Sequence, residues 1–128
     1  MSAPQTASTG PGPADASGLW LRDDTHRSCL RLQSETLLSF FEASMQGTPG
    51  FALLDHDGTP SPTEVQELHT TTRMIHSYAF GVLRGHAGAT QIVDHGMAYL
   101  TRYHEDTLHG GYVWSLNGDG VADGTKLA

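Results

Sequence analysis

The sequence predicts a mainly α-helical domain in which helices alternate with short loops. Three stretches, from about residue 23 to 45, from 63 to 84 and from 90 to 103, repeat apolar residues at the spacing of an amphipathic helix. Segments that contain glycine or proline, 47–50 and 85–88, separate these stretches, and one later stretch alternates like a strand. Helix, loop, helix, short loop, helix is the connectivity of an antiparallel helical array.

Composition narrows the class of protein. The chain has 128 residues and a net charge of −7 with only seven lysines and arginines, so it lacks the basic surface that nucleic acids and anionic membranes require. No apolar run approaches the length of a membrane span. The single cysteine, Cys29, cannot form an internal disulfide and is expected to be a small core residue.

The N-terminal segment differs in composition from the rest of the chain. Residues 1–18 are rich in Ser, Ala, Pro, Gly and Thr and have neither a positive charge nor an apolar run. This composition predicts a disordered leader and not a signal peptide. We therefore expect a cytoplasmic protein with one domain at residues 19–128.

The first helix is expected to start at the N-capping residues Asp23–Thr25 and to run to about Met45. Its broad apolar face consists of Leu30, Leu37, Leu38, Phe41 and Met45. Gly47–Gly50 should end it. Phe51–Leu54 then reads as a short extended segment, and Asp55–Gly58 as a turn.

The second helix is predicted over Thr63–Arg84 and has two different stripes. The apolar stripe consists of Leu68, Thr72, Ile75, Ala79 and Val82, and the stripe beside it of His69, Arg73, His76 and Phe80. A guanidinium, two imidazoles and a phenyl ring suit the wall of a polar pocket, because arginine offers a planar fork of donors and a ring offers a flat surface. A buried helix whose arginine pairs with a carboxylate fits the same periodicity, so both interpretations stay open.

Gly85 and Gly88 should end the second helix, and Thr90–Tyr103 should form the third. His109–Leu116 alternates like a strand, and Asn117–Gly120 should turn it back into a short β-hairpin. Within that strand Tyr112 and Trp114 share one face. They can form a stacking wall for a sugar or cap the core, and the pattern does not choose between the two.

The eight histidines do not have the spacing of a metal site. No pair shows the His-x-x-x-His pattern, and His69 and His76 lie two helical turns apart, roughly 10 Å by helix rise. The chain also has neither a P-loop, nor the glycine fingerprint of a dinucleotide site, nor the surroundings of a nucleophilic serine. The sequence therefore predicts no metal and no cofactor.

Two motifs carry a resemblance to a known family. HTTTRMIHSYAFG, followed by an amphipathic helix and then by EDTLHGGYVWSLNGDG, resembles the N-terminal part of the N-acylglucosamine 2-epimerase superfamily. The similarity is greatest to its mannose isomerase branch and runs from about His26 to Ala128. It implies a partial (α/α)6 barrel: about three helices and a short β-hairpin, the N-terminal portion of a longer barrel.

The resemblance also implies an activity. Members interconvert sugars without a cofactor by moving a proton through an enediol, most closely here the aldose–ketose isomerisation of mannose-like sugars. It implies that Arg73 points into the sugar pocket. His69 and His76, one turn either side of Arg73, and Tyr112 and Trp114, on one strand face, are the further candidates for binding the sugar. The resemblance also implies that the catalytic acid/base histidines lie downstream of residue 128, which leaves this chain inactive by itself. A 2-epimerase of N-acylglucosamine or a related sugar, and a non-catalytic truncated or vestigial helical module, remain as alternatives.

A partial barrel should leave an apolar flank uncovered. We expect Ile92, Tyr99, Leu100, Tyr103 and part of the Leu37–Phe41 face to be only partly covered. Such a surface on a small domain favours self-association. The expected partners are therefore a small-molecule sugar and further copies of the chain, with no nucleic acid and no membrane.

Overall fold

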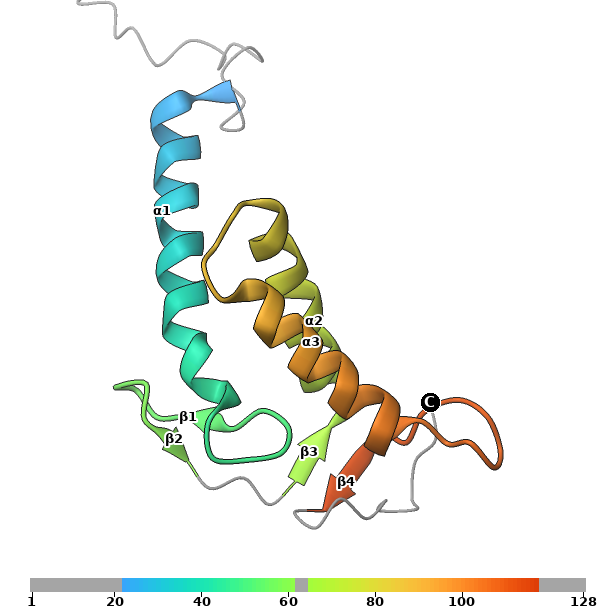
Figure 1. Cartoon of the computed structure of the whole chain (residues 1–128). Coiled ribbons are helices and arrows are strands. Elements are labelled where there is room, and N and C mark those ends of the chain that lie inside the picture. Colours follow the sequence, from blue (N-terminus) through green and yellow to red (C-terminus); the bar gives the residue numbers. More distant parts are fainter. Residues whose placement is uncertain (1–21, 62–64, 118–128) are drawn as a thin grey trace, which may run out of the picture. The chain divides into compact units, whose positions relative to one another are not determined.

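The computed structural model describes residues 22–61 and 65–117 (Figure 1). The predicted leader, residues 1–18, and most of the predicted turn Asn117–Gly120 lie outside the described residues. The chain divides into two compact units, Met1–Ser34 and Glu35–Ala128. Helix α1, Asp24–Phe41, crosses from the first unit into the second, and all other elements belong to the second.

The first helix forms where the sequence predicts it. The Asp23 carboxylate accepts hydrogen bonds from the backbone N–H groups of Thr25 (2.8 Å) and His26 (3.3 Å), which caps the start of α1. A 3₁₀ turn, η3 (Glu42–Met45), continues the helix, and Gly47, with φ of +81°, lies just beyond it. Cys29 was expected in the core, but it is exposed.

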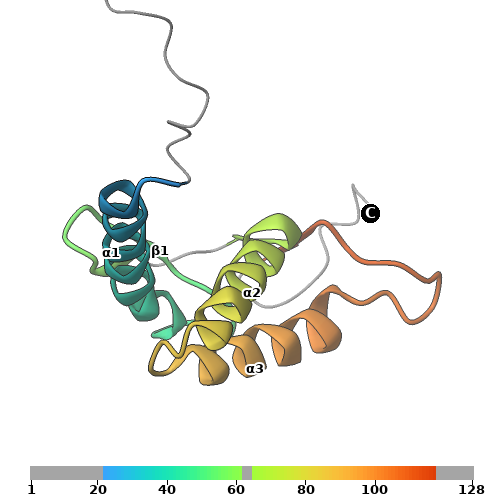
Figure 2. The same cartoon turned by 90° about the horizontal axis from the view of Figure 1, so that it is seen from above.

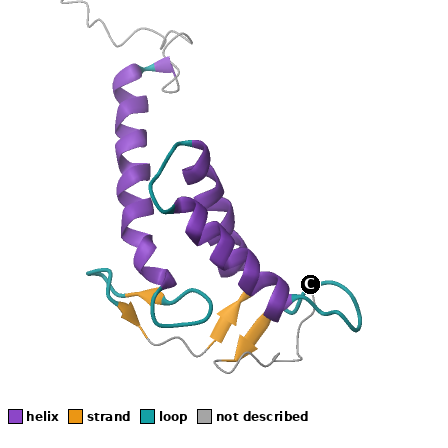
Figure 3. Cartoon of the chain, in the orientation of Figure 1, coloured by secondary structure: helices purple, strands orange, loops and turns teal. Residues whose placement is uncertain are grey.

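A small hairpin follows, as the predicted extended segment and turn suggest. Strands β1 (Leu53–Leu54) and β2 (Pro60–Ser61) pair antiparallel. The turn between them is closed by Gly58 N–H, which donates to the Asp55 carbonyl over 2.9 Å. Figure 3 shows this hairpin among elements that are otherwise mostly helical.

Helix α2, Leu68–Leu83, starts later than predicted. Residues 65–67 were assigned to the helix, but they form strand β3 (Val65–Glu67), which pairs antiparallel with β4 (Ser115–Asn117). The prediction of a continuous strand over 109–116 is correct only at its end, because 109–114 form a turn and isolated bridges before β4 begins. The partner of β4 lies about fifty positions earlier in the chain. Helical periodicity does not reveal a partner so distant in sequence.

The third helix, α3 (Ala89–Tyr99), ends in a π-helical turn, η4 (Leu100–His104). As predicted, Gly85 and Gly88 separate it from α2, and both have positive φ values, +75° and +81°. Helices α2 and α3 lie side by side (Figure 2), and Gly96 allows their close approach. A Cβ atom added at Gly96 would lie 2.5 Å from Cγ1 of Ile75.

Two hydrophobic clusters form the core of the second unit. The first consists of Phe51, Tyr78, Ala89 and Ile92, and the second of Tyr99, Val113 and Leu116. The buried side of α2 carries Leu68, Thr71, Tyr78 and Gly81, so the predicted apolar stripe is wrong at Thr72, Ala79 and Val82, which are exposed. The helix is rotated because the large ring of Tyr78 points inward, with its hydroxyl donating to the Leu38 carbonyl.

The predicted uncovered flank is only partly correct. Ile92 and Tyr99 are buried, because Phe51 packs against the first and Val113 and Leu116 against the second. Leu100 and Tyr103 are half-buried, as expected. The Leu37–Phe41 face is also open: the exposed fraction of Leu37 is 57%.

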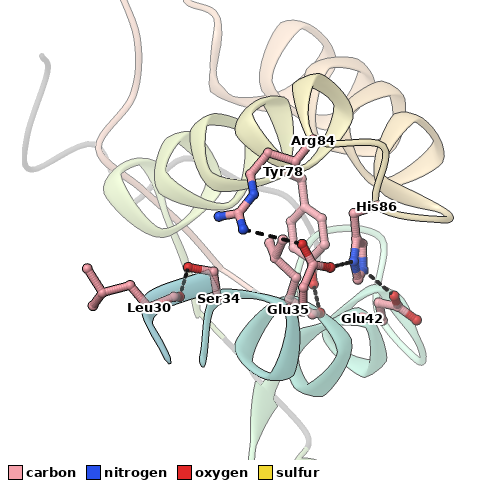
Figure 4. A network of polar contacts seen from close by, with 8 residues as sticks. Leu30, Ser34, Glu35, Glu42, Tyr78, Arg84 and His86 are labelled. Atoms are coloured by element: carbon pink, nitrogen blue, oxygen red, sulfur yellow. Dashed lines mark hydrogen bonds and ion pairs between the residues drawn. The ribbon is translucent and has the colours of Figure 1, made fainter. Parts of the chain in front are cut away.

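A polar network joins the second unit's part of α1 to the loop after α2 (Figure 4). His86, only 7% exposed, places Nδ1 at 2.8 Å from a Glu35 oxygen and Nε2 at 2.7 Å from a Glu42 oxygen. An ionised carboxylate can only accept, so both ring nitrogens donate and the ring is an imidazolium. The hydrogen bond to Glu35, with that to Glu42, raises the pKa of His86 above its usual 6.5 although burial opposes it.

We expect the stability of the chain to fall as pH rises above 6.5. Between 6.5 and the raised pKa of His86 the folded state binds a proton that the unfolded state has lost, so the free energy of unfolding decreases with pH. His86→Gln should lower the melting temperature at pH 6.5 and flatten its decline up to pH 8.5. Thermal unfolding followed by circular dichroism measures both.

His56→Gln is the matched control for this experiment, because His56 is exposed in the β1–β2 turn. It should keep the pH dependence of the wild-type chain. His104 has a pKa lowered by burial and therefore acts in the opposite direction, below pH 6.5. If the melting temperatures of the wild type and His86→Gln declined in parallel above pH 6.5, the role of His86 would be contradicted.

Gly96→Ala should destabilise the chain although alanine favours helices. The added methyl group would meet Ile75 at 2.5 Å and the Phe51 ring at 3.1 Å. Overpacking of this kind costs about 1–3 kcal/mol, and better helix propensity returns about 1 kcal/mol at most. Urea denaturation should show the loss of unfolding free energy. Gly81→Ala should lose less, because its added Cβ atom would lie 3.2 Å from its nearest neighbour, Cβ of Ala89. A higher free energy of unfolding in Gly96→Ala than in the wild type would mean that α2 and α3 move apart easily.

Candidate functional site

The predicted sugar-binding residues come from two segments that the structure brings together. His69, Arg73 and His76 lie on the first turns of α2, and Tyr112 and Trp114 precede β4. The backbone N–H of Leu68, the first residue of α2, donates to the Trp114 carbonyl over 2.7 Å. The β3–β4 pairing continues this contact, so the start of α2 lies beside Trp114.

The rings of His69 and Trp114 are in contact and connect the two segments. Their ring centroids are 5.6 Å apart and their planes are tilted by 30°. His69 Nε2 lies 3.4 Å from a Glu67 oxygen. Nδ1 of His69 is covered and has no hydrogen-bond partner among the described residues. The pair thus combines two aromatic rings with a covered imidazole nitrogen that has no hydrogen-bond partner among the described residues.

Arg73 and His76 continue the same side of α2 and are both exposed. The His76 ring meets the edge of Phe80 at 5.0 Å between centroids. In the part of the chain that the structure describes, Arg73 makes no ion pair. The alternative of a buried arginine paired with a carboxylate therefore has no support here, and the guanidinium donors are available to a ligand.

Tyr112 lies apart from the other four residues. It is exposed, it forms an isolated bridge with Glu105, and no ring contact joins it to His69 or Trp114 among the described residues. Val113 between Tyr112 and Trp114 is buried, as the predicted alternation requires. The structure brings His69 and Trp114 together, places Arg73 and His76 on the adjoining helix surface, and leaves Tyr112 at the edge.

The turn before Tyr112 depends on its paired glycines. Gly110 and Gly111 have φ values of +80° and +82°, a region that glycine adopts without strain. Oδ1 of Asp106 accepts from the backbone N–H groups of Leu108 and His109, each over 3.0 Å. These bonds lower the pKa of Asp106 below its usual value, the bond from the His109 backbone most strongly. The carboxylate therefore organises the turn.

Two buried residues next to the site were not identified from the sequence. Nε2 of His104 lies 3.2 Å from the Thr71 hydroxyl, and Nδ1 lies 2.9 Å from the Val113 carbonyl. Burial lowers the pKa of His104, which keeps the ring neutral, although its bond to Val113 acts the other way. Nothing in a single sequence distinguishes this histidine from the other seven, because its partners are distant along the chain.

Comparison with known proteins shows the family to which the chain belongs. The sequence profile of the N-acylglucosamine 2-epimerase (GlcNAc 2-epimerase) family matches residues 50–128. The chain belongs to the N-acylglucosamine 2-epimerase family. It is 34% identical over 111 residues to the D-mannose isomerase of Thermobifida fusca, which covers 86% of this chain and 27% of that protein. It is 33% identical over 93 residues to the D-mannose isomerase of Pseudomonas cannabina pv. alisalensis, which covers 73% of this chain and 22% of that protein.

Solved structures support the predicted fold. A crystal structure of D-mannose isomerase superposes with a TM-score of 0.56 at 28% identity, over 71% of this chain and 25% of the other. Cellobiose 2-epimerase from Spirochaeta thermophila gives a TM-score of 0.53 at 25% identity, over 78% of this chain and 27% of the other. The prediction of a mainly helical, partial barrel is confirmed. The chain spans about a quarter of the length of these relatives.

Asp106→Ala should loosen the turn that precedes Tyr112. The change removes the acceptor of the Leu108 and His109 amides, so both should exchange with solvent faster and the melting temperature should fall. Asp106→Asn keeps an acceptor oxygen and serves as the matched control. Amide hydrogen exchange measures the effect, and equal exchange in the alanine variant and the wild type would show that the glycines alone hold the turn.

Proposed function

We propose that this chain forms one wall of the sugar pocket of an aldose–ketose isomerase that acts on mannose-like sugars. One observation carries the proposal: Arg73 is exposed and without a carboxylate partner in the described residues, one turn from the stacked His69 and Trp114. This surface belongs to a family member whose relatives include proteins named D-mannose isomerase.

The residues fit the chemistry of a ring-opened sugar. Isomerisation removes the proton at C2 and returns a proton to C1, while a hydroxyl proton moves from O2 to O1 through an enediol. Negative charge develops on an oxygen during these steps, and the planar fork of Arg73 can hold two such oxygens at once. The flat faces of Trp114 and His69 suit the apolar face of the sugar.

The proton transfers need a general acid and base, and imidazole suits this task near neutral pH. We place these groups downstream of residue 128, with no catalytic residue in the present chain and no cofactor. The chain by itself then orients a sugar but does not convert it. His69 and His76 contact the substrate in this proposal and do not take its proton.

Epimerisation at C2 is the second candidate, and the similarity to cellobiose 2-epimerase favours it. The same enediol serves both reactions, because only the carbon that receives the returning proton differs. The wall described here binds either substrate in the same manner. The product therefore decides: fructose indicates isomerisation, and glucose from mannose indicates epimerisation.

A chimaera tests the proposal, with this chain in place of the matching segment of the Thermobifida fusca D-mannose isomerase. Arg73→Ala should lower kcat/KM for mannose at least tenfold, about 1.4 kcal/mol of transition-state stabilisation. Arg73→Lys should recover little, because an ammonium lacks the bidentate fork. Coupled assay of fructose formation measures the rates.

Arg102→Ala is the matched control, because this exposed arginine belongs to η4 and lies over the Tyr103 ring, 5.3 Å from its centroid. It should leave the kinetics unchanged. The unmodified 128-residue chain should show no turnover. Normal kinetics in the Arg73→Ala chimaera would overturn the proposed role, and turnover by the chain alone would place the base within it.

A further inference from the structure

His104 is the most deeply buried polar residue near the candidate site. It is the last residue of η4, its exposed fraction is 0%, and its ring meets the edge of Tyr99 at 5.5 Å between centroids. A buried imidazole is unfavourable unless both nitrogens find partners. Both do so here, and the two partners belong to the two segments that carry the candidate site residues.

The hydrogen bonds fix the state of the ring. The Val113 carbonyl can only accept, so Nδ1, at 2.9 Å, carries the proton and donates. In the neutral ring Nε2 is then an acceptor, and the Thr71 hydroxyl donates to it over 3.2 Å. The backbone adds a further link, because Val113 N–H donates to the His104 carbonyl over 2.6 Å. One tautomer of one side chain thus connects α2 to the segment before β4.

The bridge lies behind the candidate site and not within it. Thr71 is buried, and its neighbours two positions away on α2 are His69 and Arg73. Val113 is buried, and its neighbours along the strand-like segment are Tyr112 and Trp114. In both segments a buried residue contacts His104, and the candidate ligands of the sugar lie two positions from it on α2 and next to it in the segment before β4. A shift of the ring would move the two sets of ligands relative to each other.

We propose that His104 is a positioning residue that sets Trp114 against the helix α2, which carries His69 and Arg73. The proposal rests on the sugar-binding function proposed above. In this proposal His104 does not touch the sugar. It controls the distance between the two segments that bind the sugar from different sides. Rates of positioned reactions are sensitive to such spacing, since a displacement of about 1 Å can cost a hundredfold.

The first test uses the full chain and needs no activity. Nitrogen-15 NMR of the histidine rings should show His104 neutral at pH 7, with the proton on Nδ1. Thr71→Val keeps the shape of the side chain but removes the donor to Nε2, and it should weaken the nuclear Overhauser contacts between the His69 and Trp114 rings. Thr71→Ser keeps a hydroxyl and should retain them. His104→Ala is a poorer choice, because it also opens a cavity.

The second test uses the chimaeric isomerase. Thr71→Val should lower kcat/KM for mannose by at least about fivefold, because the ligands of the sugar are displaced, and Thr71→Ser should restore it to within about twofold. Both variants are compared at a temperature where circular dichroism shows each to be folded. A loss that the serine variant reverses separates positioning from general destabilisation.

Three results overturn the proposal. One is a ring with the proton on Nε2 or with rapid titration near its ordinary pKa. Another is a Thr71→Val variant that keeps both its ring contacts and its kinetics while Arg73→Ala remains impaired, which removes the role of His104 and leaves the proposed function intact. The third is unchanged kinetics in Arg73→Ala, which removes the proposed function and the positioning role together.

Discussion

The antiparallel pairing of β3 with β4 decides how the second unit is organised. Gln66 lies opposite Leu116, and the pairing runs directly into the start of α2, where Leu68 N–H donates to the Trp114 carbonyl. The strand ends and the helix begins at this junction, so the direction of α2 is fixed by a segment about fifty residues later. The stacking of His69 on Trp114 follows from the same junction. Without it the backbone at the start of α2 would lose its direct contact with the segment that carries Trp114.

Buried polar side chains link the elements of the unit to one another in addition to its apolar clusters. Tyr78 places its ring in the core and its hydroxyl on the Leu38 carbonyl, and burial with the charge of Glu42 raises its pKa to about 12. His86 is charged between two glutamates, whereas His104 is neutral between a hydroxyl and a carbonyl. The two histidines thus differ in charge because their partners differ. Carboxylates favour the protonated ring, and burial without a carboxylate favours the neutral ring.

Several large apolar side chains of the unit are exposed. Leu83 is 82% exposed and Phe80 55% exposed on α2, and Met97 and Leu108 are exposed as well. Phe80 lies on the same side of the helix as His76, so the apolar surface and the candidate site adjoin. In the described residues no helix is long and apolar enough to cross a membrane. In the proposed function this apolar surface would strengthen the interaction of Arg73 with the charge that develops on the sugar, because a drier surrounding screens charge less.

The sequence by itself determined the three helices, the glycine breaks between them and the grouping of His69, Arg73 and His76 on one side of α2, because these features depend on neighbours within a few residues. It also identified the family through two short motifs. Only the tertiary structure decided that 65–67 is a strand, that Tyr78 turns α2 so that Thr72 and Val82 face outward, and that His104 ties Thr71 to Val113. Each of these depends on partners far away along the chain, and a local pattern of apolar and polar residues contains no information about which distant group satisfies a buried hydrogen bond.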